Sequence, residues 1–291
     1  MKKVLFKGSA TAMVTPFDKN KKINFDIWEK LIDFQINNQT QALVILGTTG
    51  ESPTITYEER TEIISRIVKK VNKKIPVIIG TGSNSTMTAL KLSKEAQELG
   101  ADAVLIVTPF YNKTSQTGII KHYDYIANKI NLPIIVYNVP SRTGLNILPE
   151  TYKELSKIDN IIAVKEANGD ISSIIETKFL CGDDLNIYSG NDDQTIAINS
   201  VGGIGVISVL SNILPKETQQ IALGDNKNFF KYYNLAKNLF CDVNPIPIKY
   251  ALNYLGINCG NCRLPLCELD KNLKNKISNL INKYQIKINL K

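Results

Sequence analysis

The chain of 291 residues is 43% hydrophobic and 21% charged, and both values are ordinary for a globular protein. It has no apolar run near the ~18 residues of a membrane-spanning helix and no secretory segment at its N-terminus, so we expect a soluble, cytoplasmic protein that contacts no membrane. The net charge of +8 comes from scattered lysines, which favours weak attraction of carboxylate metabolites over binding of nucleic acid.

Short β-rich apolar runs alternate with longer stretches of helical period along most of the chain. The expected strands are Gly8 to Val14, Ala42 to Gly47, Pro76 to Gly80, Ala103 to Val107, Pro133 to Tyr137, Ile161 to Lys165, Asn186 to Gly190 and Gly203 to Ser208. The expected helices are Asp26 to Asn37, Tyr57 to Val71, Thr86 to Leu99, Gln116 to Ile130, Pro149 to Leu155, Ile171 to Phe179 and Asp192 to Val201. Eight alternating units of this kind predict an α/β fold, a (β/α)8 TIM barrel with a closed parallel sheet.

The residues after the eighth unit exceed what a barrel needs. They contain three more helical patterns, at Asn228 to Phe240, Pro245 to Leu255 and Glu268 to Tyr284, with no linker-like composition before them. We therefore expect a catalytic barrel over residues 1–224 and additional C-terminal helices over residues 225–291 that pack on it.

The apolar run Ile161 to Val164 ends in a lysine, Lys165, where a buried strand should finish. The carboxyl ends of the strands are where barrel enzymes place their reactive groups. A lysine that attacks a carbonyl carbon must be deprotonated, and burial lowers its pKa in that direction. From this stretch alone the alternative stays open that Lys165 reaches solvent or pairs with Glu166.

Other polar residues follow the neighbouring strands. Thr48 and Thr49 lie in a glycine-bounded turn whose hydroxyls and N–H groups can hold a carboxylate, although any polar turn looks similar. Tyr137 ends the strand next to that of Lys165, so its phenol can exchange protons with the amine or merely pack on the core. Arg142 follows in a turn, where it can bind a carboxylate bidentately or simply face solvent.

Signals for a metal or nucleotide are weak. Gly80-Thr81-Gly82 begins like a dinucleotide fingerprint, but Ser85 occupies the position of its third glycine. Cys259 and Cys262 have metal-ligand spacing without a second pair to complete a site, and the odd count of five cysteines suggests reduced thiols. We expect no metal and no cofactor.

Taken together, the motifs resemble the dihydrodipicolinate synthase family of pyruvate-dependent class I lyases and aldolases. The resemblance runs almost end to end, and the number and order of its motifs make it specific. It is carried by Gly47-Thr48-Thr49-Gly50-Glu51, Thr108-Pro109-Phe110-Tyr111-Asn112, Tyr137-Asn138-Val139-Pro140-Ser141-Arg142-Thr143-Gly144, Val164-Lys165-Glu166, Ser189-Gly190-Asn191-Asp192, Gly205-Val206-Ile207-Ser208 and Arg263-Leu264-Pro265-Leu266.

The resemblance implies a reaction and a set of roles. Pyruvate would condense with L-aspartate 4-semialdehyde to 4-hydroxy-tetrahydrodipicolinate, the first committed step of the diaminopimelate and L-lysine pathway. Lys165 would form the Schiff base. The family's proton relay matches Thr48, Tyr111 and Tyr137, with the Tyr111 position supplied by a neighbouring subunit. The substrate-holding positions match Thr49, Arg142, Gly190 and Ile207, of which Arg142 would bind the semialdehyde carboxylate.

Two alternatives remain at this point. N-acetylneuraminate lyase and keto-sugar-acid aldolases share the lysine and the tyrosine, while the Thr48-Thr49 pair and Arg142 favour the synthase. A non-catalytic sensor of small molecules on the same barrel is disfavoured because all four of Lys165, Tyr137, Thr48 and Tyr111 are kept.

The resemblance also implies a homo-oligomer, usually a tetramer built as a dimer of dimers, although some family members stop at the dimer. Family members inhibited by L-lysine have an allosteric pocket at a subunit interface. Its histidine, glutamate and tyrosine positions are occupied here by Tyr57, Thr88 and Phe110, while Ser52 and Asn84 are kept. We therefore expect weak inhibition by L-lysine or none.

Overall fold

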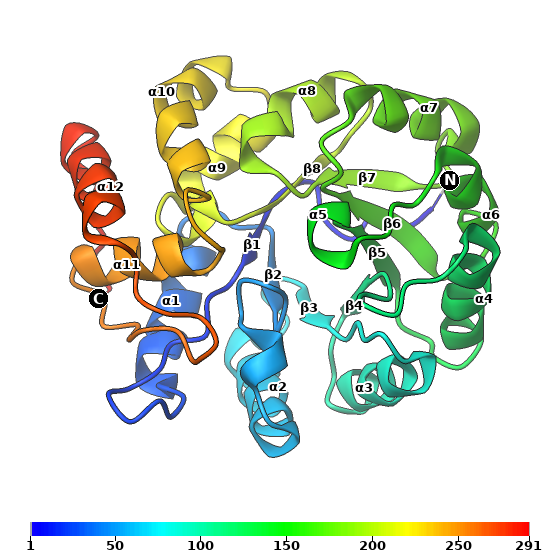
Figure 1. The fold of residues 1–291 in the computed structure, drawn as a ribbon, viewed down its shortest axis with the longest axis horizontal. Coiled ribbons are helices and arrows are strands. Elements are labelled where there is room, and N and C mark those ends of the chain that lie inside the picture. The colour runs from blue at the N-terminus through cyan, green and yellow to red at the C-terminus, as the bar shows by residue number, and fades with distance from the viewer. Residues whose placement is uncertain (1, 291) are drawn as a thin grey trace.

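Eight parallel strands close into a barrel in which each strand pairs with the next and β8 returns to β1. The structure, a computed structural model, describes residues 2–290. The strands are β1 (Gly8–Ala12), β2 (Ala42–Ile45), β3 (Val77–Gly80), β4 (Ala103–Val107), β5 (Ile134–Asn138), β6 (Ile161–Glu166), β7 (Asn186–Ser189) and β8 (Gly205–Ser208). The expected (β/α)8 TIM barrel is confirmed (Figure 1).

Helices follow the strands and surround the barrel (Figure 1). They are α1 (Phe25–Asn37), α2 (Tyr57–Val71), α3 (Thr86–Glu98), α4 (Gln116–Ala127), α5 (Pro140–Thr143), α6 (Pro149–Leu155), α7 (Ile171–Cys181), α8 (Thr195–Ser200) and α9 (Pro215–Ala222). Short 3₁₀ turns η1 (Ser52–Thr54), η2 (Asp192–Gln194) and η3 (Leu210–Asn212) lie at the carboxyl side of three strands.

Most expected boundaries hold within a few residues, and the differences have local causes. The first strand ends at Ala12 because the Val14 N–H donates to the side chain of Asn212 at 3.2 Å instead of continuing the ladder. β6 extends one residue further than expected, to Glu166, so Lys165 is the residue before the last of the strand. The turn expected around Arg142 is the short helix α5, which begins at Pro140, a residue that suits a first helical turn.

Apolar residues fill two separate regions. A smaller cluster, including Ala10, Val44, Ile135 and Ile207, fills the inside of the barrel. A larger cluster lies between the strands and the surrounding helices. The strands are thus buried on both faces, which is why their sequences are continuous apolar runs without polar alternation.

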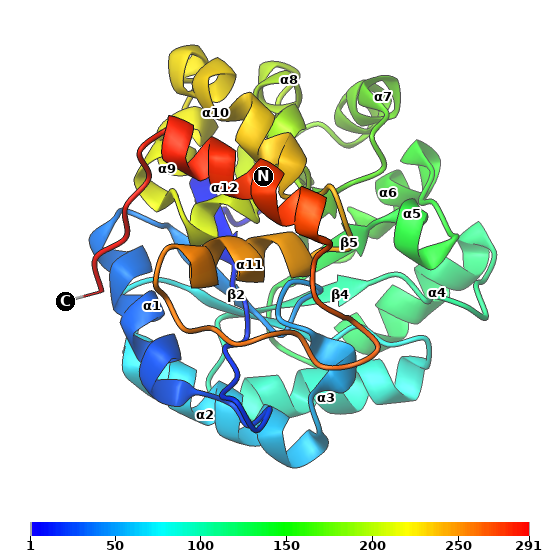
Figure 2. The ribbon, with the colours of Figure 1, turned by 60° about the vertical axis from the view of Figure 1, so that its left-hand side comes forward.

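Three helices follow the barrel: α10 (Asn226–Asn238), α11 (Ile246–Tyr254) and α12 (Lys271–Lys283). Ile248 and Leu252 of α11 are fully buried in the same cluster as Val14 and Trp28 from the start of the chain. Figure 2 shows α11 and the segment after it in front of the barrel, near α1 and α2. No helix within residues 2–290 is long and apolar enough to cross a membrane.

Candidate active site

A cavity of about 430 Å³ opens at the carboxyl ends of β2 to β5. Among its lining residues are three that the sequence predicted for substrate chemistry, namely Thr48, Tyr137 and Arg142. Three of the predicted allosteric residues, Ser52, Thr88 and Phe110, line the same cavity. The two groups of predicted residues therefore border one continuous space in the single chain.

Lys165 is buried beside this cavity, with 6% of its surface exposed. Its strand register pairs it with Tyr137, and its ammonium nitrogen lies 4.5 Å from the centre of the Tyr137 ring. Burial lowers the pKa of Lys165 to about 8; the Asp192 carboxylate opposes this shift and the Arg142 guanidinium adds to it. At pH 7 a pKa of 8 leaves roughly 10% of the amine deprotonated, against roughly 0.04% for an ordinary lysine.

Glu166 follows Lys165 but does not serve as its counter-ion. Its carboxylate accepts hydrogen bonds from Asn138 Nδ2 at 3.0 Å, Tyr152 Oη at 2.7 Å and the Asn168 N–H at 2.9 Å. Because successive side chains of a strand point to opposite faces, this network lies behind the strand ends that carry Tyr137 and Lys165. Burial raises the pKa of Glu166 to about 7.

Tyr137 is 7% exposed, and its phenol lies close enough to the Thr48 side chain for that side chain to affect its pKa. Burial raises the pKa of this phenol, while Arg142 and the Thr48 side chain lower it. The expected approach of Tyr137 to Lys165 is thus seen for the Tyr137 ring, and Thr48 is a further neighbour of the phenol. A proton can pass between the lysine side of the cavity and the Thr48 hydroxyl through such a pair of hydroxyl groups.

The turn that carries Thr48 and Thr49 uses several of its own amides. The Gly50 N–H donates to the Gly47 carbonyl and the Glu51 N–H donates to the Thr48 carbonyl, each at 3.1 Å, so these two amides are not free to bind a carboxylate. The Thr49 hydroxyl accepts a hydrogen bond from Asn244 Nδ2 at 3.0 Å. Because a hydroxyl that accepts can still donate, Thr49 keeps its hydrogen for a carboxylate.

Asn244 is a site residue that the sequence did not reveal. It is 6% exposed, lines the cavity, contacts Thr49 through its side chain and accepts from Arg142 Nη2 at 3.2 Å through its backbone carbonyl. It therefore contacts both residues predicted to hold carboxylates. Asn244 lies 195 residues from Thr49, and only its position before Pro245 marks it in the sequence.

Asp192 is a second residue to which the sequence assigned no role. It is 6% exposed, and its carboxylate accepts from the N–H groups of Val209 and Leu210 at 2.9 and 3.0 Å. It influences the pKa of Lys165 and is the carboxylate that favours the charged amine. Its position directly after β7 was visible in the sequence, but nothing there showed that it turns toward β6 and β8.

Gly190 and Ile207 do not line the cavity itself. The Gly190 N–H donates to the Glu166 carbonyl at 2.7 Å, and a Cβ at this position would lie 2.7 Å from the Ala167 Cβ. Only glycine fits so close an approach. Ile207 is fully buried in the cluster inside the barrel, paired with Ala10 of β1.

Three other predicted residues are outside the cavity lining. Tyr111 has a positive φ of 68° and is 91% exposed, so it points away from its own chain. Tyr57 is 46% exposed, with the Lys91 ammonium 4.5 Å above its ring. The backbone carbonyl of Asn84 accepts from Asn112 Nδ2 at 3.0 Å. In the single chain these residues do not join the group around Lys165.

The two cysteines with metal-ligand spacing, Cys259 and Cys262, are buried. Burial raises the pKa of each thiol to about 12, whereas a metal ligand must be a thiolate. Within the described part of the chain, no group of three histidine, cysteine or acidic side chains is placed to hold a metal ion.

Comparisons with known proteins point to one family. The family model described as the dihydrodipicolinate synthetase family matches residues 5–284. A 4-hydroxy-tetrahydrodipicolinate synthase of Clostridium perfringens (strain SM101) is 50% identical over 278 residues, covering 92% of this chain and 95% of the relative. One of Alkaliphilus oremlandii is 49% identical over 290 residues, covering 97% and 100%.

A solved structure of dihydrodipicolinate synthase from Thermotoga maritima has a TM-score of 0.94 at 42% identity, covering 97% of this chain and 99% of that one. The match thus extends over the barrel and the C-terminal helices together. The chain belongs to the dihydrodipicolinate synthetase family.

Proposed function

We propose that this enzyme condenses pyruvate with L-aspartate 4-semialdehyde through a Schiff base on Lys165. The overall activity is the one that its curated relatives are named for, 4-hydroxy-tetrahydrodipicolinate synthase, in the diaminopimelate and L-lysine pathway. The observation that supports the mechanism most strongly is a buried lysine with a lowered pKa beside the Tyr137 ring. We place the reaction in the cytoplasm, in a barrel formed by residues 1–224 with residues 225–291 packed on it.

In the proposed reaction the two substrates combine into one product and one water molecule is released. The free amine of Lys165 attacks the pyruvate ketone, and water leaves as the iminium forms. The iminium withdraws electrons, so the pyruvate methyl group loses a proton and the resulting enamine attacks the aldehyde. The amine of the bound semialdehyde then attacks the iminium carbon, closes the ring and releases Lys165.

The residues around the lysine have distinct parts in this scheme. Thr49 donates its hydroxyl hydrogen to the pyruvate carboxylate, and Thr48 and Tyr137 relay protons. Arg142 binds the carboxylate of the semialdehyde. Gly190 and Ile207 border the pyruvate side, where a larger side chain at 190 would clash with Ala167.

Borohydride trapping tests the proposal directly. Reduction in the presence of pyruvate should attach a pyruvate-derived group to the peptide that contains Lys165, as measured by mass spectrometry. The trapping rate should rise with pH and level off above about pH 8, because deprotonation of a lysine with a pKa of about 8 supplies the nucleophile. An adduct confined to another lysine would contradict the proposed role of Lys165.

We further propose that the enzyme works as a homo-oligomer, a tetramer composed of two dimers, in which Tyr111 completes the relay of a neighbouring subunit. Tyr111 is 91% exposed in the single chain, which supports this role because a tyrosine that relays protons in a buried site must be covered, here by the neighbouring subunit. Mixing inactive Tyr111→Phe with inactive Lys165→Ala should restore about a quarter of the wild-type activity, since half of the randomly formed dimers contain one complete site.

A matched control distinguishes this rescue from simple mixing effects. Tyr137 and Lys165 belong to the same subunit's site, so Tyr137→Phe mixed with Lys165→Ala should give no recovery. Subunit exchange is verified by mass spectrometry of isotope-labelled protein. If neither mixture recovers activity although exchange is complete, Tyr111 acts within its own subunit or not at all.

We expect L-lysine to inhibit this enzyme weakly or not at all. Thr88 stands where lysine-inhibited family members have a glutamate, so an acceptor for the ammonium group is missing. Phe110 lacks a phenol, and the Tyr57 ring already has the Lys91 ammonium above it. A hydrogen bond to a charged group contributes roughly 1.5–3 kcal/mol, so losing two weakens binding by about two powers of ten or more.

The measurement is the initial rate against lysine concentration at subsaturating pyruvate, with calorimetry for binding. Thr88→Glu should strengthen lysine binding, whereas Thr88→Gln, of the same size but uncharged, should do so far less. Half-inhibition of the wild type in the sub-millimolar range would show that other residues replace the missing acceptors.

A further inference from the structure

Glu51 has an unusual backbone conformation directly after the turn that carries Thr48 and Thr49. Its φ is 54°, in the left-handed region that residues other than glycine rarely adopt. The residue is 2% exposed. Such a conformation costs free energy and persists only where the surroundings impose it. The Glu51 N–H donates to the Thr48 carbonyl, so the conformation of Glu51 is coupled to the position of Thr48.

Two groups from the far end of the chain hold the Glu51 carboxylate. Lys249 Nζ donates to Oε1 at 2.8 Å, and the Arg263 N–H donates to Oε2 at 2.8 Å. Both side chains of the ion pair are buried, with exposures of 2% for Lys249 and 0% for Glu51. A buried charge that lacks its partner is strongly destabilising, so each member fixes the position of the other.

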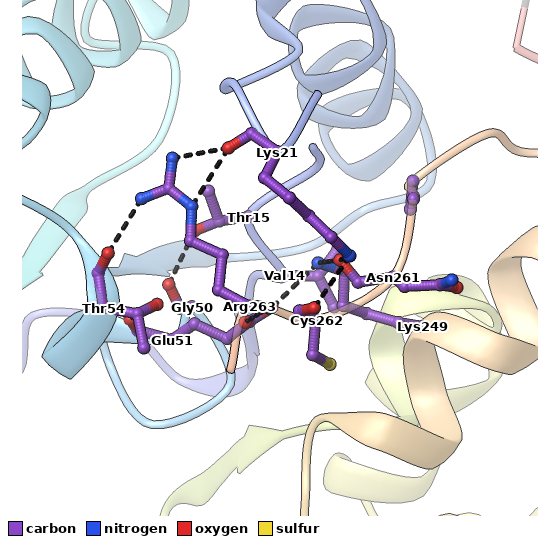
Figure 3. A network of polar contacts seen from close by, with 12 residues as sticks. Val14, Thr15, Lys21, Gly50, Glu51, Thr54, Lys249, Asn261, Cys262 and Arg263 are labelled. Atoms are coloured by element: carbon purple, nitrogen blue, oxygen red, sulfur yellow. Dashed lines mark hydrogen bonds and ion pairs between the residues drawn. The ribbon is translucent and has the colours of Figure 1, made fainter. Parts of the chain in front are cut away.

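Further contacts connect Glu51 and its two partners to the N-terminal part of the chain (Figure 3). Lys249 Nζ lies 4.1 Å from the centre of the Phe17 ring and Arg263 Cζ lies 4.4 Å from it. The Arg263 guanidinium donates to the Thr54 carbonyl at 2.8 Å, and the Thr15 hydroxyl donates to the Gly50 carbonyl at 2.7 Å. The turn is therefore held on both sides of Glu51.

One member of the ion pair lines the cavity, so the pair can affect the cavity without contacting a substrate. Glu51 lines the cavity next to Thr48, whereas Lys249 reaches it only through the Glu51 carboxylate. Burying two charges gives little net stability compared with apolar residues of the same size. A gain in fold stability is thus a poor explanation for the pair. A better explanation is that Lys249 holds Glu51, the residue of the turn with the strained backbone conformation.

We propose that Lys249 is a positioning residue for pyruvate binding: its ammonium holds Glu51 in the left-handed conformation that sets the Thr48 and Thr49 hydroxyls. This inference rests on the proposed roles of those two threonines. Under this proposal α11, which lies outside the barrel repeat, affects the reaction through Glu51 and does not contact the reacting atoms.

Lys249→Met tests the inference because methionine keeps most of the volume and removes the charge. The KM for pyruvate should rise about tenfold or more, since a misplacement of about 1 Å in a binding group can cost up to ~10²-fold. The KM for the semialdehyde should change by less than about threefold, because Arg142 is held by the Asn244 carbonyl and not by the pair. At saturating pyruvate, borohydride should still label Lys165.

Two further variants keep the test decisive. Lys274→Met is the matched control: it breaks the surface pair between Lys274 of α12 and Glu268, and it should leave both KM values unchanged. The double variant Lys249→Met/Glu51→Gln leaves no unpaired buried charge, so it should fold even if the single variant does not, and it should still show the raised pyruvate KM.

A wild-type pyruvate KM in the folded double variant would overturn the inference. So would equal increases in both KM values, which would indicate a general structural role. Failure of the proposed function looks different, because it would appear in the wild-type protein as the absence of a pyruvate adduct on Lys165.

Discussion

Replacing Lys165 by alanine should abolish turnover while leaving the fold intact. The side chain supplies the nucleophile of the proposed covalent mechanism, and removing such a group typically costs ~10⁴-fold or more in kcat. Stability should change little: the strand is held by its neighbours, and the variant no longer buries an amine whose pKa is lowered by desolvation. The Tm should remain within about 3 °C of the wild-type value.

The measurement combines steady-state kinetics, borohydride trapping and thermal unfolding. Lys165→Arg is the matched variant, because it keeps a positive charge but is not deprotonated near neutral pH. It should be as inactive as Lys165→Ala and give no adduct. Residual turnover above ~1% of the wild type in either variant would show that another group provides the nucleophile.

Replacing Arg142 by alanine should raise the KM for the semialdehyde by about tenfold to a hundredfold, because a hydrogen bond to a charged group contributes roughly 1.5–3 kcal/mol. Arg142 is exposed at the cavity, and its guanidinium donates a hydrogen bond to the Asn244 carbonyl. It is thus available for a carboxylate. The KM for pyruvate should change by less than about threefold.

Arg142 also contributes to lowering the pKa of Lys165, so its removal should raise that pKa, and the two proteins are compared at the pH at which the rate of each levels off. Arg142→Lys should give an intermediate KM because it keeps the charge and loses the bidentate geometry. Arg66→Ala, which removes an exposed arginine from α2, is the surface control. Equal losses for both substrates in Arg142→Ala would mean that the arginine only maintains the structure around Asn244.

The barrel and the place of Lys165 were predictable because their signals are local. Eight apolar runs separated by helical patterns predict the closed sheet, and a lysine at the end of such a run predicts a polar group at the barrel mouth. The approach of Tyr137 to Lys165 also follows, because neighbouring strands of a barrel bring their ends together. The short helix α5 at Pro140 was missed because four residues carry too little periodicity to distinguish a helix from a turn.

The support of the site was not predictable from local patterns. Asn244 contacts Thr49 across 195 residues and Lys249 contacts Glu51 across 198, and no periodicity or spacing encodes such pairs. Glu51 even lies in a turn where a charged residue would ordinarily face solvent. The roles of these residues depend on how α11 and the segment before it pack on the barrel, which only the three-dimensional structure describes.

The long separation of these contacts has a consequence for synthesis. Chains fold from the N-terminus as they leave the ribosome. All eight strands, including the segment with Lys165 and Tyr137, have been made by residue 208, but Asn244 and Lys249 emerge later. A nascent chain can therefore close its barrel around the reactive lysine before the threonine turn is held in place. Within one chain, the proposed pyruvate pocket is therefore completed only after the region that contains Asn244 and α11 has been made.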